Sequence, residues 1–151
     1  MAKSIFVCLV LLVGCRVSMP PDIYSFRSFE VYSASYDQVW SAVEDYVKGQ
    51  EWELEMLDRD AGVIGSDWFE DDASAGDYGN RGGIWTLVKG SKKMMVNVRV
   101  MKVSERETRV RVNCLFEAKW SGGEKKQTAS GTSKGIVERK ILNGIAARLE
   151  R

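Results

Sequence analysis

Few side chains in this sequence have the types and spacing that catalysis needs. None of its 151 residues is histidine, the most common general base of enzymes. Cys114 has the chemistry of a nucleophile, but no histidine is present to activate it, and it lies where apolar and polar residues alternate. We therefore expect Cys114 to be a small buried residue, and the sequence predicts no enzyme.

The acidic and glycine-rich segments are weak candidates for ligand binding. In a calcium loop starting at Asp58, the fifth position would be Gly62 and the twelfth Phe69, and neither has a side-chain oxygen. Residues 76–83 lack the Gly-Lys-Ser/Thr ending of a phosphate-binding loop. The Gly-x-x-Gly at 79–82 has the spacing of a KH-domain motif, but its flanks are patterned as loop and strand. We interpret these segments as a turn and a solvated loop, and expect no metal, nucleic acid or dissociable cofactor.

The first fifteen residues have the composition of an export signal. Lys3 is positively charged, residues 5–13 are apolar, and small residues precede Cys15. This apolar run is far shorter than the roughly 20 residues that a membrane-spanning helix needs. The ending Leu12-Val13-Gly14-Cys15 resembles the lipobox of bacterial lipoproteins. The resemblance implies that residues 1–14 are removed and that Cys15 receives a diacylglycerol and an N-acyl chain, which together give stable membrane anchoring. An ordinary secretory signal followed by an incidental cysteine is the alternative.

The charge of the chain is balanced. It has 22 basic and 21 acidic side chains, and removal of Lys3 with the signal would leave 21 of each. Such a balance argues against nucleic-acid binding and against a polybasic attraction to anionic lipid. With Cys8 removed and Cys15 acylated, Cys114 would be the only remaining thiol, so no disulfide within the mature chain is expected.

A short tether and a single domain are expected to follow the signal. Residues 15–25 contain Pro20-Pro21 and no apolar period, which predicts an extended, lipidated tether of about 30 Å at most. Residues 26–151 have the length of one domain. Within them, residues 26–34 alternate like a strand, and Ser35 to Gln38 forms a capping box before a helix. We expect Gly49 to end this helix in the left-handed conformation. Its apolar face consists of Tyr36, Val39, Trp40, Val43, Tyr46 and Val47.

A hairpin follows the helix. The alternation of residues 52–56 and 63–69 about the turn at 58–62 predicts that Met56 pairs with Ile64 and Trp52 with Trp68. Residues 70–83 are polar and rich in glycine, which indicates a loop. A short strand is expected at 84–88 and a turn at Gly90-Ser91.

Two long strands and a final helix complete the chain. Residues 94–100 and 108–120 each alternate. The predicted apolar face of the first strand consists of Met94, Val96, Val98 and Val100, and that of the second of Thr108, Val110, Val112, Cys114, Phe116, Ala118 and Trp120, with Arg109, Arg111, Asn113, Glu117 and Lys119 mostly on its other face. A three-residue connection at 105–107 places Val100 opposite Val112 and Val96 opposite Phe116. Residues 121–130 are interpreted as a polar connection. Thr132 or Ser133 is expected to cap the last helix, with Arg148 and Arg151 near its carbonyl end. The apolar side of that helix consists of Ile136, Val137, Ile141, Ile145 and Leu149.

This order of elements predicts an α+β fold, in which two helices pack on one face of a curved antiparallel β-sheet. The first helix would be about 20 Å long, whereas a strand from Thr108 to Trp120 would reach about 43 Å if flat. We therefore expect the long strands to twist and curl around the helices rather than to extend beyond them.

Two motifs support a family resemblance. Ser35-Tyr36-Asp37-Gln38-Val39-Trp40 opens the helix, and residues 54–64 contain the turn Asp58-Arg59-Asp60-Ala61-Gly62. With the long strands and the final helix, this order resembles the helix-grip domains of BamC over about residues 30–149. BamC is the lipoprotein accessory subunit of the outer-membrane β-barrel assembly machinery. The resemblance implies a helix-grip fold and an accessory role, with one domain here where BamC has two.

These features predict a membrane-anchored, non-enzymatic lipoprotein. Arg16 rather than aspartate follows Cys15, which by analogy with enteric lipoproteins implies sorting to the outer membrane, facing the periplasm; anchoring in the inner membrane is the alternative. The domain is expected to bind protein partners in envelope or outer-membrane assembly. The alternative is a small apolar ligand or lipid, held in a groove whose lip would be Phe69, Tyr78 and Trp85; the same three aromatic residues could instead be core.

Overall fold

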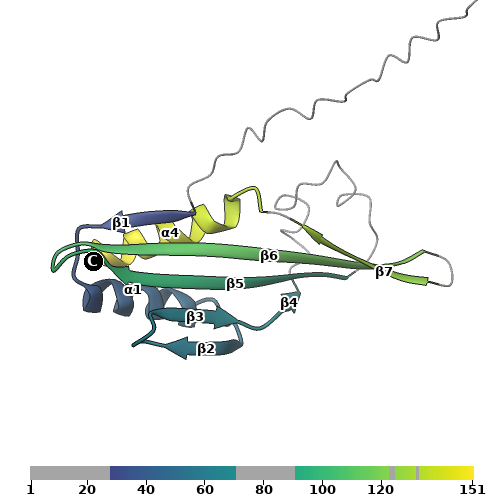
Figure 1. The fold of residues 1–151 in the computed structure, drawn as a ribbon, viewed down its shortest axis with the longest axis horizontal. Helices are drawn as coiled ribbons and strands as arrows, with labels where there is room; N and C mark the ends of the chain where they lie inside the picture. Colours follow the sequence, from purple (N-terminus) through teal and green to yellow (C-terminus); the bar gives the residue numbers. More distant parts are fainter. Residues whose placement is uncertain (1–27, 71–90, 123–124, 132) are drawn as a thin grey trace, which may run out of the picture.

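A computed structural model describes residues 28–70, 91–122, 125–131 and 133–151 (Figure 1). In these ranges the chain forms a seven-stranded antiparallel sheet and two helices, which confirms the predicted α+β class. The signal at 1–14, the tether at 15–25, the loop at 71–83 and the strand expected at 84–88 lie outside the described residues. Neither described helix is long and apolar enough to cross a membrane. In chain order the elements are β1 (Phe29–Tyr32), α1 (Tyr36–Lys48), β2 (Leu54–Asp58), β3 (Val63–Ser66), β4 (Phe69–Glu70), β5 (Ser91–Lys102), β6 (Thr108–Gly122), β7 (Lys125–Gly131) and α4 (Ile136–Leu149).

The long hairpin β5–β6 forms the centre of the sheet. The order of strands is β1-β6-β5-β3-β2, while β4 also pairs with β5 and β7 with β6. Val100 pairs with Val110 and Val96 with Cys114, so the predicted register was wrong by two residues. The turn is longer than expected, because Lys102 already pairs with Thr108 and the amide of Val103 donates to the carbonyl of Glu107. A shift of two residues leaves every side chain on its predicted face.

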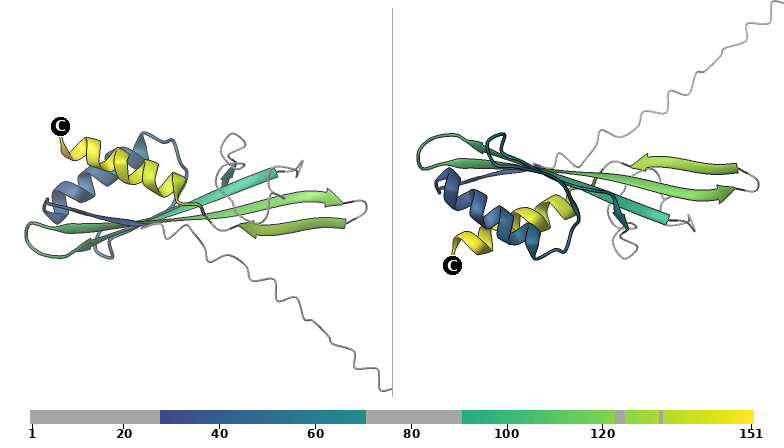
Figure 2. Two further views of the ribbon diagram at one scale, coloured as in Figure 1. Left: turned by 90° about the horizontal axis from the view of Figure 1, so that it is seen from above. Right: turned by 90° about the horizontal axis from the view of Figure 1, so that it is seen from below.

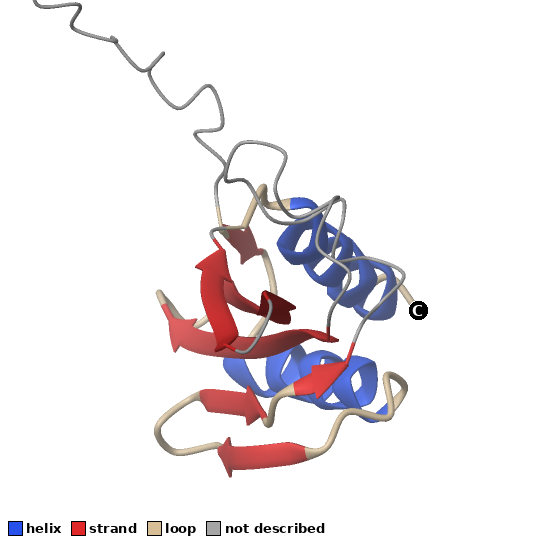
Figure 3. Ribbon diagram, turned by 90° about the vertical axis from the view of Figure 1, so that its right-hand side faces the viewer, coloured by secondary structure: helices blue, strands red, loops and turns tan. Residues whose placement is uncertain are grey.

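Both helices pack on the apolar face of the sheet (Figure 2). They also contact each other and lie side by side, with α4 against β6 and β1 and α1 against β5 (Figure 3). Trp40, only 1% exposed, is the largest fully buried side chain. The Tyr32 hydroxyl donates to the carbonyl of Leu142 at 2.8 Å and so ties β1 to α4. The predicted buried faces are confirmed for Val39, Trp40, Val43, Tyr46 and Val47 of α1, Met94, Val96, Val98 and Val100 of β5, and Thr108, Val110, Val112, Cys114, Phe116 and Ala118 of β6.

The start of α1 confirms the predicted capping box. The amide of Gln38 donates to Ser35 Oγ at 3.4 Å, and the amide of Ser35 donates to Gln38 Oε1 at 3.0 Å. The prediction for the other end was wrong, because Gly49 has φ −73° and ψ −8° and is therefore right-handed. The left-handed residue is Glu51, with φ 58°, since one more turn forms before the chain reverses.

The β2–β3 hairpin turns at residues 58–62 as predicted, but its pairing differs. Leu57, not Met56, pairs with Ile64, because the register shifts between Leu54 and Met56. The shift turns Met56 to the side of the sheet away from the helices, where it is 51% exposed. Trp52 does not pair with Trp68; its ring stacks on that of Phe69, with 5.6 Å between the centroids.

The final helix begins differently from the prediction. Its N-cap is Gly135, with φ 78°, and no side chain caps it. The Ser133 hydroxyl, a predicted cap, instead accepts from the amide of Gly135 and donates to Glu138; Thr132, the other predicted cap, lies outside the described residues. Arg148 and Arg151 donate to the carbonyls of Gly144 and Ala147, as expected at the carbonyl end. Ile136 is exposed although it was predicted to be apolar core, and Leu142 is buried in addition to the predicted residues.

The far half of the sheet was not expected. Residues 121–130 were interpreted as a polar connection, but β6 continues to Gly122 and β7 pairs along it. Ser91 is the first residue of β5 rather than part of a turn. Figure 2 shows β6 and β7 extending well beyond the helices, so the expectation that the long strands curl around the helices was wrong. There β7 pairs with the outer edge of β6 and so satisfies its backbone hydrogen-bonding groups.

Both edges of the central hairpin change neighbours at the same place. Along β6, the pairing with β1 stops at Arg111 and the pairing with β7 starts at Phe116, which lies opposite the last residue of β7. Along β5, β3 pairs with residues 97–99, whereas β4 pairs with Met94 and Lys93. Val96 and Cys114 pair with each other, and among the described residues no strand pairs with the outer edge of either one; we call these two positions the gaps.

Buried side-chain oxygens take the place of a strand in both gaps. The amide of Val96 donates to Ser66 Oγ at 2.9 Å, and the amide of Cys114 donates to Glu138 Oε1 at 3.2 Å. Burial and the Glu138 carboxylate both raise the pKa of the Cys114 thiol, which therefore stays protonated, in agreement with its expected role as a small core residue.

Candidate functional site

The face of the sheet opposite the helices is the candidate functional site. Figure 2 shows that neither described helix covers it. We call this surface the open face. By the strand pairing, its central positions are Phe29 and Val31 of β1; Met56 and Asp58 of β2; Val63 and Gly65 of β3; Met95, Asn97, Arg99 and Met101 of β5; and Arg109, Arg111, Asn113 and Leu115 of β6.

Three arginines lie together in the middle of the open face, and we call them the arginine row. Arg99 of β5 lies directly opposite Arg111 of β6, and Arg109 is the next residue of β6 on the same face. Side chains directly opposite each other have Cβ atoms about 4.5–5.5 Å apart, and like charges at such positions destabilise a sheet. The fold therefore holds positive charges close together although it gains no stability from doing so.

Phe29 holds two of these guanidinium groups against the sheet. Its ring centroid lies 5.2 Å from the guanidinium carbon of Arg109 and 6.0 Å from that of Arg111, within the range of cation–π attraction. Arg109 Nε is buried and has no hydrogen-bond partner within the described part of the chain. A buried donor without a partner is unfavourable, so this group would gain from an acceptor.

The carboxylates on the same face already have other partners. Asp58 Oδ1 accepts from the amide of Ala61 at 2.8 Å, and Glu117 pairs with Lys119 at 2.9 Å. Glu70 accepts from the Ser91 hydroxyl at 3.1 Å. Among the ion pairs of the described residues, none includes an arginine of the row. The row is therefore a local positive charge in a chain whose total charge is close to zero, and the balance of charges in the sequence did not reveal it.

Exposed apolar side chains surround the arginine row. Val31 is 39% exposed, Met56 51% and Leu115 46%. Single exposed apolar residues are ordinary, but these three share one face with a ring and three guanidinium groups. Exposed apolar and aromatic side chains next to arginine are typical of surfaces that bind proteins.

The predicted site residues lie elsewhere or outside the described residues. Phe69 is half-buried in β4 and stacks on Trp52, which meets the Tyr46 ring edge-on at 6.2 Å. Phe69 thus packs against the core, which was the alternative interpretation of this residue. Tyr78 and Trp85, the other two expected at the lip of the groove, and Cys15, the expected site of lipidation, lie outside the described residues.

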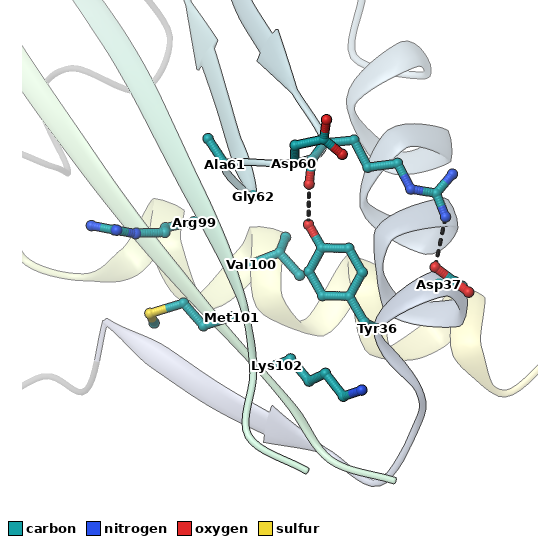
Figure 4. Close-up of a pocket in the computed structure, with 10 residues that line it drawn as sticks. Tyr36, Asp37, Asp60, Ala61, Gly62, Arg99, Val100, Met101 and Lys102 are labelled. Atoms are coloured by element: carbon teal, nitrogen blue, oxygen red, sulfur yellow. Dashed lines mark hydrogen bonds and ion pairs between the residues drawn. The ribbon is translucent and has the colours of Figure 1, made fainter. Parts of the chain in front are cut away.

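A hollow of about 530 Å³ lies between the start of α1, the turn at 58–62 and the end of β5 (Figure 4). The Tyr36 hydroxyl donates to the carbonyl of Arg59 at 2.5 Å, and Arg59 pairs with Asp37 at 2.7 Å. Gly62, with φ 67°, closes the turn against the carbonyl of Val100, which a Cβ would meet at 2.2 Å. A second hollow is lined by Ser33, Ala34, Gln38, Ser41, Ala42, Asp45, Arg148 and Leu149. Most side chains of both hollows are polar or charged, and Arg59 is already neutralised.

Sequence reasoning located the arginines on a polar face but did not bring them together. In the predicted register Arg99 would lie opposite Asn113, whereas the observed shift of two residues puts it opposite Arg111. The alternation at 108–120 predicted that Arg109 and Arg111 share one face, but nothing local fixes the pairing with Arg99.

A comparison with models of known protein families and a comparison with curated proteins both found no match. The resemblance to BamC therefore remains a prediction from the sequence. The fold and the site define the class of the protein as far as its structure goes: an α+β domain with two helices on one face of an antiparallel sheet and an arginine-bearing face left open.

Proposed function

We propose that this protein is a lipoprotein, held in the outer membrane through Cys15, whose domain faces the periplasm and binds other envelope proteins. Its role would be that of a non-enzymatic accessory in envelope or outer-membrane assembly. The observation that carries the proposal is the open face, where the arginine row and exposed apolar side chains lie on the same face of one sheet. Surfaces of this composition are typical of protein interfaces.

The other candidate, binding of an apolar ligand, has less support from the described residues. Of the three residues expected at the lip of the groove, only Phe69 is described, and its ring is already stacked on Trp52. The two hollows are lined mostly by polar and charged groups, whereas small-molecule sites are mostly apolar. Binding of a protein partner is therefore the better supported of the two functions.

The first test concerns the anchor. Replacing Cys15 with serine removes the sulfur that would carry the diacylglycerol, so the variant should move from the membrane fraction to the soluble periplasmic fraction. Cell fractionation followed by immunoblotting measures this. The matched control is Cys8→Ser, because Cys8 lies in the segment expected to be removed and its substitution should leave the protein in the membrane. The lipoprotein proposal fails if Cys15→Ser stays in the membrane or if the wild-type protein remains in the cytosol.

The second test concerns the partner. A photo-crosslinking amino acid at position 115, on the open face, should capture a protein of the envelope when cells are irradiated. The same amino acid at position 140, an exposed residue of α4, is the control and should give at least about tenfold less of that product, since hot spots cluster at the centre of an interface. Equal capture at both positions, or capture at neither, would contradict the proposed use of the open face.

A further inference from the structure

We propose that the partner presents an extended protein segment with both carboxylate and apolar side chains on the face that meets the sheet, and that its carboxylates bind the arginine row. This inference rests on the proposed function and adds the chemistry of the partner. Three features of the open face carry it: the arrangement of the guanidinium groups, the depth at which they lie, and the position of the apolar side chains.

The arrangement of the guanidinium groups favours the binding of anions. Arg99 and Arg111 face each other across two paired strands, and Arg109 lies beside them with a buried nitrogen that lacks an acceptor. The carboxylates on this face are engaged with Ala61, Ser91 and Lys119. A bound carboxylate would offset the repulsion between Arg99 and Arg111 and can accept two parallel hydrogen bonds from one guanidinium group.

The depth of the row favours side chains over a flat surface as the source of the anions. Phe29 holds Arg109 and Arg111 down on the sheet, and Arg109 is partly buried. Carboxylates on flexible side chains can reach into such a surface, whereas lipid headgroups in a bilayer lie in one plane and would meet the exposed rim first.

The apolar residues set the rest of the partner's chemistry. Leu115 lies four residues beyond Arg111 on β6, and Val31 pairs with Arg109 from the neighbouring strand. Side chains of an extended segment alternate between two faces, and only some of them can meet arginines. A segment whose every second side chain faces the sheet, with carboxylates and apolar groups both among them, satisfies the row and also covers Val31 and Leu115, which a purely acidic face would leave exposed.

The test compares two pairs of substitutions in the full chain carrying Cys15→Ser, so that no acyl chain contributes to binding. The open-face pair is Arg99→Gln with Arg111→Gln. The control pair, Arg106→Gln with Lys140→Gln, removes the same charge from exposed residues in the β5–β6 turn and on α4. The probe is a short fluorescein-labelled peptide in which every second residue is glutamate or leucine in turn and serine lies between them, together with its version in which glutamine replaces every glutamate. Fluorescence anisotropy measures the binding.

We expect the open-face pair to weaken binding of the glutamate peptide by about tenfold or more, and the control pair by less than about twofold. The glutamine peptide should bind weakly to every form. Thermal unfolding shows whether the variants fold, and the open-face pair should be at least as stable as the parent, because it removes a repulsion. Equal effects of the two pairs would overturn the inference. So would arginine-dependent binding to vesicles containing phosphatidylglycerol, or to inorganic phosphate, without binding to the peptide.

Two outcomes distinguish failure of this inference from failure of the proposed function. If crosslinking at position 115 captures a partner that the open-face pair still binds as tightly, the interaction function stands and the acidic segment is wrong. If the peptide binds through the arginines but no envelope protein is captured, the proposed function is wrong.

Discussion

Replacing Glu138 with alanine should lower the free energy of unfolding by about 2–4 kcal/mol. Glu138 is only 3% exposed, and both of its carboxylate oxygens accept hydrogen bonds. Oε1 accepts from the amide of Cys114 at 3.2 Å, and Oε2 accepts from the Ser133 hydroxyl at 2.6 Å. Alanine would leave both donors without this acceptor, and the amide of Cys114 is buried in the gap between β1 and β7, where no strand can replace it.

Urea denaturation measures the change, and two variants separate its causes. Glu138→Gln keeps the shape and one acceptor, so it should lose clearly less stability than alanine. Ser66→Ala removes the corresponding acceptor from Val96 on the other edge of the hairpin and should cost about 1–2 kcal/mol, because that bond is neutral. A loss of less than about 1 kcal/mol for Glu138→Ala would show that the carboxylate does not hold this gap together.

Replacing Gly144 with alanine should destabilise the protein by about 2–3 kcal/mol, although the same change in an exposed helix normally stabilises it. A Cβ at this position would lie 2.2 Å from Cε2 and 2.7 Å from Cδ2 of the Tyr46 ring, where α4 crosses α1. Arg148 also contacts that ring, with its guanidinium carbon 4.9 Å from the centroid. The ring therefore cannot move aside without breaking a second contact.

A double-mutant cycle checks this explanation. Tyr46→Leu removes the ring, so the additional loss caused by Gly144→Ala should fall to less than about 0.5 kcal/mol in that background. Asn143→Ala, on the exposed side of the same helix, is the control and should change stability by less than about 1 kcal/mol. Additive effects of Tyr46→Leu and Gly144→Ala would contradict a clash between the two residues.

The sequence predicted those features that depend on local pattern. The capping box at Ser35 was correct because its two hydrogen bonds involve residues three apart. The buried faces of β5 and β6 were correct because alternation alone decides which side chains share a face. The order of the elements before residue 70 was correct for the same reason.

Features that depend on turn length or distant contacts could not be predicted in this way. A hairpin shifted by two residues keeps the same faces, so the pattern could not distinguish Val100–Val112 from the observed Val100–Val110 pair. The strand β7, Lys-Lys-Gln-Thr-Ala-Ser-Gly, has no apolar alternation, since it takes its stability from pairing with β6. Ser133 looked like a helix cap, but the buried Glu138 competes for its hydroxyl.

The candidate site also combines features that the local sequence pattern predicts with features that depend on distant contacts. Phe69 was identified by its residue type and position near a loop, but its partner Trp52 comes from the other side of the β2–β3 hairpin. The arginine row needs the correct pairing of β5 with β6 before its members become neighbours. The exposure of Met56 depends on a one-residue irregularity in β2, for which its sequence gives no signal.

The change of neighbours at the Val96–Cys114 pair has a mechanical consequence. Two backbones run without interruption from the helix-covered end to the projecting end, but laterally the sheet is held at this point by one serine and one glutamate instead of flanking strands. Bending stiffness should therefore be lowest at the middle of the molecule and higher on either side of it. A load applied to the projecting tip would reach the helical core along the β5–β6 hairpin and through the short segments that join β3 to β4 and β7 to α4, so the sheet should bend about Ser66 and Glu138.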